Sequence, residues 1–574
     1  MDRVYSILLV VLILLGGCNV SEQHEPADVL FTHAKVYTMN ATRPTASAVG
    51  VLKGKIIFVG SDTEAKKYIG DNTKVIDLKQ NTMTPGFIES HGHFMGMGYS
   101  EMDLNLMKTR SYDDLLEMVK MAVSRAKPGE WILGRGWHQS KWDPQPAVMI
   151  KGFQTNERLN AISPDNPVYL THASGHAAFA NDVAIKLAGV NQLSVEQIQK
   201  DTQGGEIIRD KLGNPTGIFT ETTQKLIASK IPDRTEAQKD RAMELAIENC
   251  QKNGITSFVD AGAPRETLAR YQKFKDEGKL GVRMYVMLTG RDPSLLEEWY
   301  KKGSMIDSVD HFYTIRSIKL NCDGALGSRG AWLLEDYTDR PGHRGAATIS
   351  MDFVKDVAEK GLLHGFQVCS HAIGDRTNRE VLDRYEWAFN QHPVLAKDSR
   401  YRIEHAQHLN PVDIPRFARL GVIASMQAIH LSSDRPWAID RLGKKRIEEG
   451  AYMWQSLLKS GAKVINGTDV PVEPIDPIAC FFASVTRQTL QGTPPGGYEP
   501  KEKMTREQAL RSYTLDAAYG EFEENYKGSI EVGKAADFTV FSQDIMTIPD
   551  NKILNTRIVK TILGGNIVYD SSDQ

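Results

Sequence analysis

Short apolar, β-branched runs recur through the middle of the chain, and longer segments of helical periodicity separate most of them. Segments 234–252, 351–364 and 378–391 show apolar residues spaced three or four apart. Strands that alternate with amphipathic helices indicate a parallel sheet or barrel, and eight of them predict an α/β fold of the (β/α)8 type. The predicted strands are 83–91, 256–261, 283–288, 315–321, 366–371, 401–405, 422–426 and 463–468.

Both ends of the chain show a different pattern, in which short β-rich runs alternate with turns. Because the two ends share this texture, we expect them to pair into one small β-sandwich domain, formed by 28–82 and 525–574. The barrel would then comprise 83–93 and 251–524. The link between its first two strands, 94–250, is too long for a βα unit. It predicts a large inserted subdomain over the face where barrel enzymes hold their active sites.

The first residues have the pattern of an export signal. The apolar run 7–15 is too short to cross a bilayer, which needs ~20 apolar residues, and it fits a signal peptide. Leu15-Gly16-Gly17-Cys18 resembles a bacterial lipobox. We therefore expect a signal at 1–18 with Cys18 as the lipidation site, a polar tether at 19–27, and an exported lipoprotein anchored to a membrane of the bacterial cell envelope only through lipid. The alternative is an ordinary cleaved signal with an incidental cysteine.

Composition and charge exclude several classes of protein. The 574 residues are 41% hydrophobic and 25% charged, as in ordinary globular chains. A net charge of −3 gives no general electrostatic basis for binding nucleic acid, so we expect no such partner. The five cysteines lie far apart without a CxxC pair, which argues against a disulfide framework and a thiolate zinc site. The four beyond Cys18 are expected to be reduced.

Histidines and an aspartate stand at the ends of several predicted strands. His91 and His93 close the first strand, and residues i and i+2 of a strand point to the same side. A single histidine there is more simply explained as a satisfied core residue. Polar groups at the ends of apolar strands are costly unless something satisfies them, and their repetition predicts a metal centre. The repeated positions are His371, His405 and Asp469, at the ends of the fifth, sixth and eighth strands.

Lys319 lies near the end of the fourth predicted strand, where its side chain is hard to solvate. Desolvation lowers the pKa of a lysine and increases its neutral fraction. A neutral amine can add carbon dioxide to give a carbamate, whose carboxylate could bridge two cations. The alternative is a structural lysine paired with a nearby acid such as Asp323.

Several blocks of the sequence, in the order observed, resemble the amidohydrolase superfamily. They match its YtcJ-like branch (amidohydrolase family 3), which is similar to N-substituted formamide deformylases, over nearly all of the chain after residue 27. Glu89 is a departure, since aspartate is usual there. The blocks are TPGFIESHGH, KLNCDGALGSRGA, SHAIGDRTN, RIEHAQH, NGTDVPVEP and YTLDAAYGEFEENYKGSIEVGKAADFTVF.

The resemblance implies a metal-dependent hydrolase barrel with two divalent cations. Zinc is the first expectation, with manganese or iron as alternatives. Asp469 and Lys319 would be catalytic, Asp469 as general base and then acid, and carboxylated Lys319 as the bridge between the cations. A thiolate of Cys322 is an alternative bridge. The other implied ligands are His91 and His93, which with Asp469 would hold one cation, and His371 and His405 for the other.

The expected substrate is a small molecule with a carbon–nitrogen bond other than a peptide bond, of the N-acyl or N-formyl amide type. Loops over the barrel mouth should recognise it through Trp137, His176, Arg329 and His343, with His176 first because of its place in the SGH block. An amino-heterocycle deaminase of the same superfamily is the second interpretation, although such relatives usually lack a bridging lysine. A lipoprotein that binds a ligand without turnover is the third. A homodimer is left open.

Overall fold

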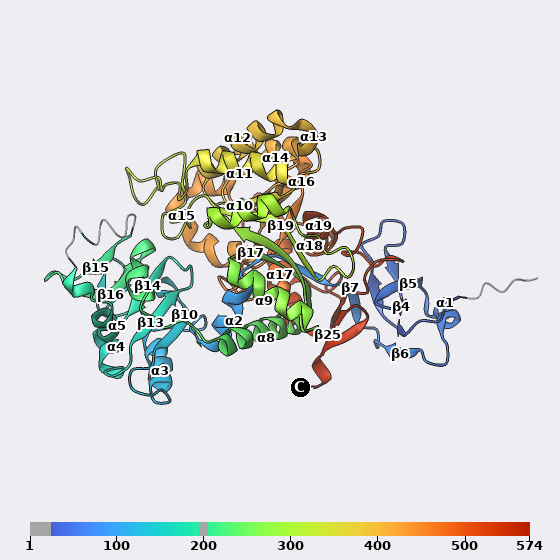
Figure 1. Ribbon diagram of the computed structural model, residues 1–574, viewed down its shortest axis with the longest axis horizontal. Helices are drawn as coiled ribbons and strands as arrows, with labels where there is room; N and C mark the ends of the chain where they lie inside the picture. The colour runs from blue at the N-terminus through green and yellow to red at the C-terminus, as the bar shows by residue number, and fades with distance from the viewer. Residues whose placement is uncertain (1–23, 194–196, 198–204, 574) are drawn as a thin grey trace, which may run out of the picture.

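The centre of the computed structural model, which describes residues 24–193, 197 and 205–573, is an eight-stranded parallel barrel (Figure 1). This confirms the predicted (β/α)8 fold class. The predicted signal 1–18, including Cys18, and residues 19–23 of the tether lie outside the described residues, so the lipoprotein signal stays a prediction. In barrel order the strands are β8 (Phe87–Gly92), β17 (Ile255–Ala263), β18 (Arg283–Thr289), β19 (Tyr313–Asn321), β20 (Gln367–Ala372), β21 (Arg402–His405), β22 (Ile423–Met426) and β23 (Val464–Asn466).

Backbone hydrogen bonds beyond the last strand close the barrel. The N–H of Asp469 donates to the carbonyl of His91 at 2.8 Å, and the N–H of His93 donates to the carbonyl of Val470 at 2.7 Å. The carboxyl ends of the first and last strands therefore meet. The outer layer contains α9 (Arg265–Asp276), α10 (Pro293–Lys302), α11 (Met351–His364), α12 (Asp375–Gln391), α14 (Ile414–Leu420), α16 (Trp454–Ser460) and α17 (Pro477–Thr486).

The predicted first strand, 83–91, is in fact two strands. β7 (Thr82–Pro85) pairs with β24 (Phe538–Phe541) outside the barrel, whereas β8 belongs to the barrel. Gly86 lies between them, where a Cβ would stand 2.1 Å from Oγ1 of Thr256. Only glycine lets the chain pass here from one sheet to the other, and an uninterrupted apolar pattern does not reveal this break.

The two ends of the chain form a β domain of two sheets. An apolar cluster that includes Phe31, Val49, Phe538 and Val540 packs between them. The first sheet contains β1 (Val29–Thr32), β4 (Ala48–Leu52), β5 (Lys55–Gly60) and β6 (Lys74–Asp77). The second contains β7, β24, β2 (Lys35–Tyr37), β3 (Thr45–Ala46), β25 (Ile558–Leu563) and β26 (Asn566–Asp570).

Only the middle part of the predicted insertion, 94–250, forms a separate subdomain. Its first and last helices, α2 (Phe94–Met102) and α8 (Glu236–Lys252), pack on each other and join the core of the barrel. The apolar side of α8, including Met243 and Cys250, explains this packing. Between these helices lies a six-stranded sheet with cores of its own, made of β9 (Leu104–Asn105), β10 (Ile132–Trp137), β13 (Val168–His172), β14 (Ala177–Ala180), β15 (Ile207–Arg209) and β16 (Pro215–Thr220).

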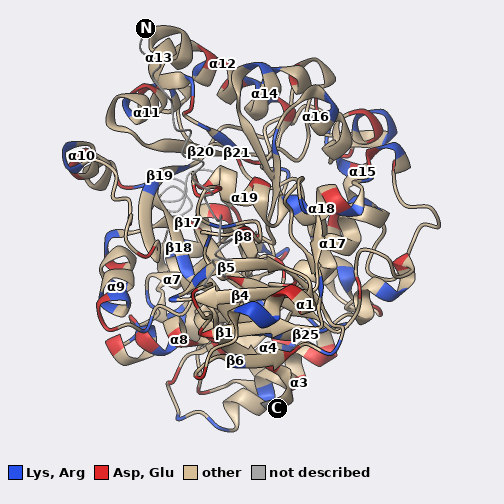
Figure 2. Cartoon of the chain, turned by 90° about the vertical axis from the view of Figure 1, so that its right-hand side faces the viewer, with Lys and Arg blue, Asp and Glu red and all other residues tan. Residues whose placement is uncertain are grey.

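The surface carries both signs of charge, with acidic and basic residues interspersed along the outer helices (Figure 2). This matches the near-neutral total of the sequence. Within the described ranges, no helix combines the length and apolar character needed to cross a bilayer. Cys250, Cys322, Cys369 and Cys480 are buried and free, as expected for reduced thiols.

Candidate metal centre

Histidines from three barrel strands converge at the carboxyl end of the sheet. His91 comes from β8, His371 from β20 and His405 from β21. The ring centroid of His405 lies 4.9 Å from that of His91 and 4.5 Å from that of His371. The ring of His93, just after β8, lies 5.8 Å from the ring of His91. Four of the predicted ligands therefore form one continuous cluster.

Asp469, from the segment after β23, completes this cluster. Its Oδ1 lies 3.3 Å from Nε2 of His93 and 3.6 Å from Nε2 of His91. One ligand atom from each of His91, His405 and Asp469 lies within 4.8 Å of the other two. Oδ1 of Asp469 and Nε2 of His371 are buried and make no hydrogen bond among the described residues. Buried acceptors are rarely left unsatisfied, so this donor set fits a bound cation.

The protonation states of these groups also suit a cation. Burial and the nearby Lys319 lower the pKa of His91 to about 4, and burial together with His371 lowers the pKa of His405 well below its usual value. Both imidazoles are therefore neutral at pH 7 and keep a lone pair. Burial opposes ionisation of Asp469, but its close contacts with the rings of His93 and His91 hold its pKa well below the ordinary value. The site thus presents neutral rings and a carboxylate.

Lys319 on β19 points at this centre. It is 3% exposed, and its Nζ lies 3.1 Å from Nε2 of His91. Burial lowers its pKa. The alternative pairing with Asp323 is not observed among the described residues. That carboxylate instead accepts hydrogen bonds from the N–H of Gly374 at 2.9 Å and the hydroxyl of Thr377 at 2.7 Å, and its Oδ1 lies 3.3 Å from Nε2 of His371.

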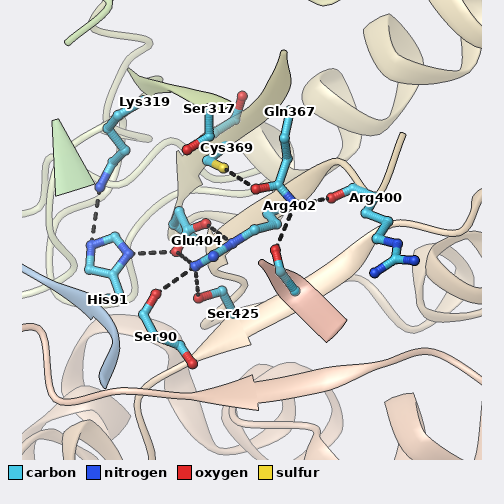
Figure 3. Close-up of polar contacts among 12 residues, drawn as sticks. Ser90, His91, Ser317, Lys319, Gln367, Cys369, Arg400, Arg402, Glu404 and Ser425 are labelled. Carbon is cyan, nitrogen blue, oxygen red and sulfur yellow. Dashed lines mark hydrogen bonds and ion pairs between the residues drawn. The ribbon is translucent and has the colours of Figure 1, made fainter. Parts of the chain in front are cut away.

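Glu404 connects the centre to a buried arginine (Figure 3). Its Oε2 lies 2.5 Å from Nδ1 of His91. Nε of Arg402 donates to Oε1 of Glu404 at 2.7 Å, and another guanidinium nitrogen donates to Ser425 Oγ at 2.9 Å. Burial disfavours the charge on Glu404, but Arg402 and His91 hold its pKa well below normal. An acceptor at Nδ1 fixes the tautomer that leaves Nε2 of His91 free for a metal.

Glu89 braces the segment that carries Asp469. Its Oε1 accepts from the N–H of Thr468 at 2.6 Å and its Oε2 from the Thr468 hydroxyl at 3.1 Å. A Cβ on Gly467 would stand 2.4 Å from Oε1, so the close approach needs glycine. Burial raises the pKa of Glu89 to about 8. Glu89, which stands where aspartate is usual, therefore supports the segment that carries Asp469.

The backbone is strained at two of the expected ligands. His405 has φ = +74° and Asp469 has φ = +59°, in the left-handed region that non-glycine residues rarely adopt. The ring of His405 is further held by Gln427, whose Oε1 lies 2.7 Å from Nδ1. Such strain persists only where the surrounding structure fixes it, and it clusters at functional sites.

The predicted substrate-binding residues do not lie in the cluster of expected metal ligands. Trp137 is 0% exposed, and its indole N–H donates to the carbonyl of Leu170 at 2.8 Å inside the core of the insertion. The prediction that Trp137 binds substrate is therefore corrected to a packing role, because no surface of its ring is open to a ligand. His176 is half-buried and lies on the insertion, with Nδ1 at 2.8 Å from Oε2 of Glu221.

The other two predicted contacts brace one loop. Arg329 forms an ion pair with Asp339 at 2.8 Å, and Nε2 of His343 lies 2.9 Å from the carbonyl oxygen of Arg329. Neither side chain has a contact with the expected ligands among the residues described. Cys322 is buried, and burial raises the pKa of its thiol. The thiolate bridge stays an alternative, because a bound cation would itself favour the thiolate.

Two polar residues near the centre were missed in the sequence. His430 and Asp434 lie on α15 (Ala428–Gly450), which begins just after β22. The ring of His430 is stacked on that of His405, with centroids 6.1 Å apart. The sequence feature that could have identified them is a polar pair with i, i+4 spacing that directly follows a predicted barrel strand.

Comparison with known proteins agrees with this geometry. The model of the amidohydrolase family matches residues 74–569. The chain is 30% identical to the putative amidohydrolase YtcJ of Bacillus subtilis (strain 168), over 94% of this chain and 98% of that protein. It is 27% identical to the N-substituted formamide deformylase of Arthrobacter pascens, over 95% and 98% of the two chains.

A solved structure is similar as well. It is an uncharacterized metal-dependent hydrolase from Pyrococcus horikoshii OT3, with a TM-score of 0.72 and 26% identity, which covers 91% of this chain and 99% of that one. The family match spans most of the chain and includes every expected ligand. The chain therefore belongs to the amidohydrolase family, and it is a hydrolase that acts on carbon–nitrogen bonds.

Proposed function

We propose that this amidohydrolase cleaves small N-acyl or N-formyl amides at a centre of two divalent cations, with zinc expected before manganese or iron. The observation that carries the proposal is the buried Lys319 beside a cluster of histidines and one carboxylate. The Arthrobacter relative, whose name specifies a formamide substrate, supports the N-formyl class. The proposed ligands are His91, His93 and Asp469 for one cation and His371 and His405 for the other, with carboxylated Lys319 as the bridge.

The residues of the chain have separate tasks in this proposal. When bound, divalent cations lower the pKa of water and polarise a carbonyl. Asp469 is ionised and lies at the mouth of the barrel, so it can take the proton from the attacking water and return it to the leaving amine. The neutral Lys319 amine forms a bond from Nζ to the carbon of carbon dioxide and releases one proton, which leaves a carbamate with one negative charge.

A screen with restored metals tests this proposal. We expect that removing metal with a chelator abolishes hydrolysis, and that adding zinc, manganese or iron(II) restores it on N-formyl and N-acyl amides. Metal content per chain is measured in the same samples. Ammonia release from amino-heterocycles, in the absence of amide hydrolysis, would contradict the proposal and favour the deaminase.

The insertion is expected to control substrate choice and not metal binding. Replacing His176 with alanine should change the ratio of kcat/KM between two amides by about tenfold, the equivalent of ~1.4 kcal/mol, while metal content stays unchanged. Glu221→Gln serves as the matched variant, since Glu221 lies 2.8 Å from the ring of His176 and should produce a smaller shift in the same direction. Loss of metal in either variant would place His176 in the metal centre instead.

A further inference from the structure

Helix α15 carries polar side chains from the metal centre outward. It begins at Ala428, directly after β22, and the residue before it, Gln427, holds the ring of His405 at 2.7 Å. The helix lies on the side of the barrel that faces the insertion (Figure 1). The first turn of the helix therefore lies beside the expected ligand His405, which the ring of His430 also contacts.

His430 has a ring nitrogen with nothing to bind. The residue is 8% exposed and stacks on His405 with an interplanar angle of 16°. Its Nε2 is buried and makes no hydrogen bond among the described residues. Leaving a buried polar atom without a hydrogen bond is unfavourable. A ligand seated at the metal centre would lie beside this nitrogen and could satisfy it.

Asp434 lies one helical turn farther out on the same face. It is half-buried, and its carboxylate accepts one hydrogen bond, from the hydroxyl of its neighbour Ser433 at 3.0 Å. No ion pair of Asp434 is found in the described part of the chain, and the arginines on the same helix, Arg435 and Arg441, pair with Glu499 and Asp339. Carboxylates away from bulk water are normally paired with a cation, so this one is poised for a partner from outside the chain.

The surroundings of Asp434 carry a net negative charge. Burial raises the pKa of its carboxyl to about 6, while His430 and Lys141 of the insertion oppose that rise and Glu473 adds to it. Lys141 forms no ion pair with Asp434 within the described residues, and the negative charge of Glu473 acts on Asp434 through space. The carboxylates of Asp434 and Glu473 together outweigh the one ammonium, that of Lys141, which favours a cationic ligand over an anionic one.

We propose that His430 and Asp434 form a substrate-recognition subsite, in which His430 contacts the scissile amide and Asp434 binds an ammonium group farther along the substrate. The i, i+4 spacing on a helix separates the two contacts by about 6 Å along the axis. The substrate class is thus an amide whose amine portion carries a cationic group two or three bonds beyond the amide nitrogen. This inference rests on the proposed amide hydrolysis.

Two probes of equal size test the subsite. N-formylethylenediamine carries an ammonium where N-propylformamide carries a methyl group, and both have six non-hydrogen atoms. The wild-type enzyme should give a kcat/KM at least tenfold higher for the ammonium probe. Asp434→Asn should raise KM for the ammonium probe at least tenfold more than for the neutral probe, with metal content preserved. His430→Gln should lower kcat/KM for both probes.

Asp440→Asn is the matched control, because Asp440 is an exposed aspartate on the same helix. It should retain the wild-type preference between the probes. If Asp434→Asn affects the two probes equally or not at all while amides are hydrolysed, the subsite is refuted and the proposed function stands.

If neither probe is hydrolysed, the subsite can still be tested separately from the proposed amide hydrolysis. Calorimetry then measures how tightly the ammonium probe binds to the metal-loaded protein. Weaker binding in Asp434→Asn than in Asp440→Asn would support the subsite although the hydrolysis of amides had failed. Equal binding in the two variants would overturn the subsite as well.

Discussion

Replacing Lys319 with arginine should remove at least one metal ion per chain and lower turnover by about 10³-fold, the equivalent of roughly 4 kcal/mol of transition-state stabilisation. A guanidinium stays cationic and cannot form a carbamate. The variant would therefore place a permanent positive charge at the position where Nζ of Lys319 now lies 3.1 Å from the ring nitrogen expected to bind metal. Metal content by mass spectrometry and hydrolysis of an N-formyl amide measure the two effects.

Lys319→Ala with an added short carboxylic acid tests the bridge itself. Removing the side chain should lose metal and activity, and acetate or propionate should partly restore both by supplying the missing carboxylate. Burial lowers the pKa of Lys319, so the neutral amine that reacts with carbon dioxide becomes more abundant as pH rises and is lost as pH falls. Labelled carbon dioxide should accordingly be retained by the wild-type chain more at pH 8 than at pH 6.

Lys463→Arg is the control, since Lys463 is a half-exposed lysine that pairs with Asp516 at 3.0 Å near the last barrel strand. It should keep full metal content and activity. If Lys319→Arg also kept two metal ions and wild-type turnover, the carbamate mechanism would be refuted. Lys319 would then be a structural cation, and the one-metal deaminase would become the better interpretation.

The barrel and the convergence of the expected ligands were predictable because they are encoded locally. Each barrel strand is a short apolar run, and an expected ligand at its end, such as His371 or His405, interrupts that run. Parallel strands in a barrel place their carboxyl ends at one face, so positions far apart in sequence converge without further information. The break at Gly86 was not encoded in this way, because it depends on the close approach of Thr256.

The supporting contacts were not predictable from local patterns. Glu404 stands next to His405 in sequence, but alternation turns the two side chains apart, and Glu404 instead contacts His91 across the interior of the barrel. Trp137 resembles a binding residue in sequence, yet it fills the core of the insertion. Such outcomes depend on which buried surfaces meet, and a single strand or loop carries no record of its distant neighbours.

Replacing Glu404 with glutamine should weaken metal binding by about 10–100-fold, the usual effect of removing a partner behind a metal-binding histidine. His91 would lose the carboxylate that fixes its tautomer at 2.5 Å. The guanidinium of Arg402, which is 0% exposed, would lose its counter-ion. The free energy of unfolding should fall by roughly 3–5 kcal/mol, because a buried charge without a partner is strongly destabilising. Competition with a chromogenic chelator and denaturant unfolding measure the two effects.

A second substitution separates the two roles of Glu404. In the double variant Glu404→Gln with Arg402→Met, the buried charge is gone, so most of the lost stability should return while metal affinity stays low. Glu448→Gln is the surface control, since its exposed pair with Lys444 should contribute no more than about 1 kcal/mol. If metal affinity recovered together with stability, Glu404 would act only by neutralising Arg402. If affinity stays low in the refolded double variant, the carboxylate acts directly on His91 and holds its ring nitrogen toward the cation.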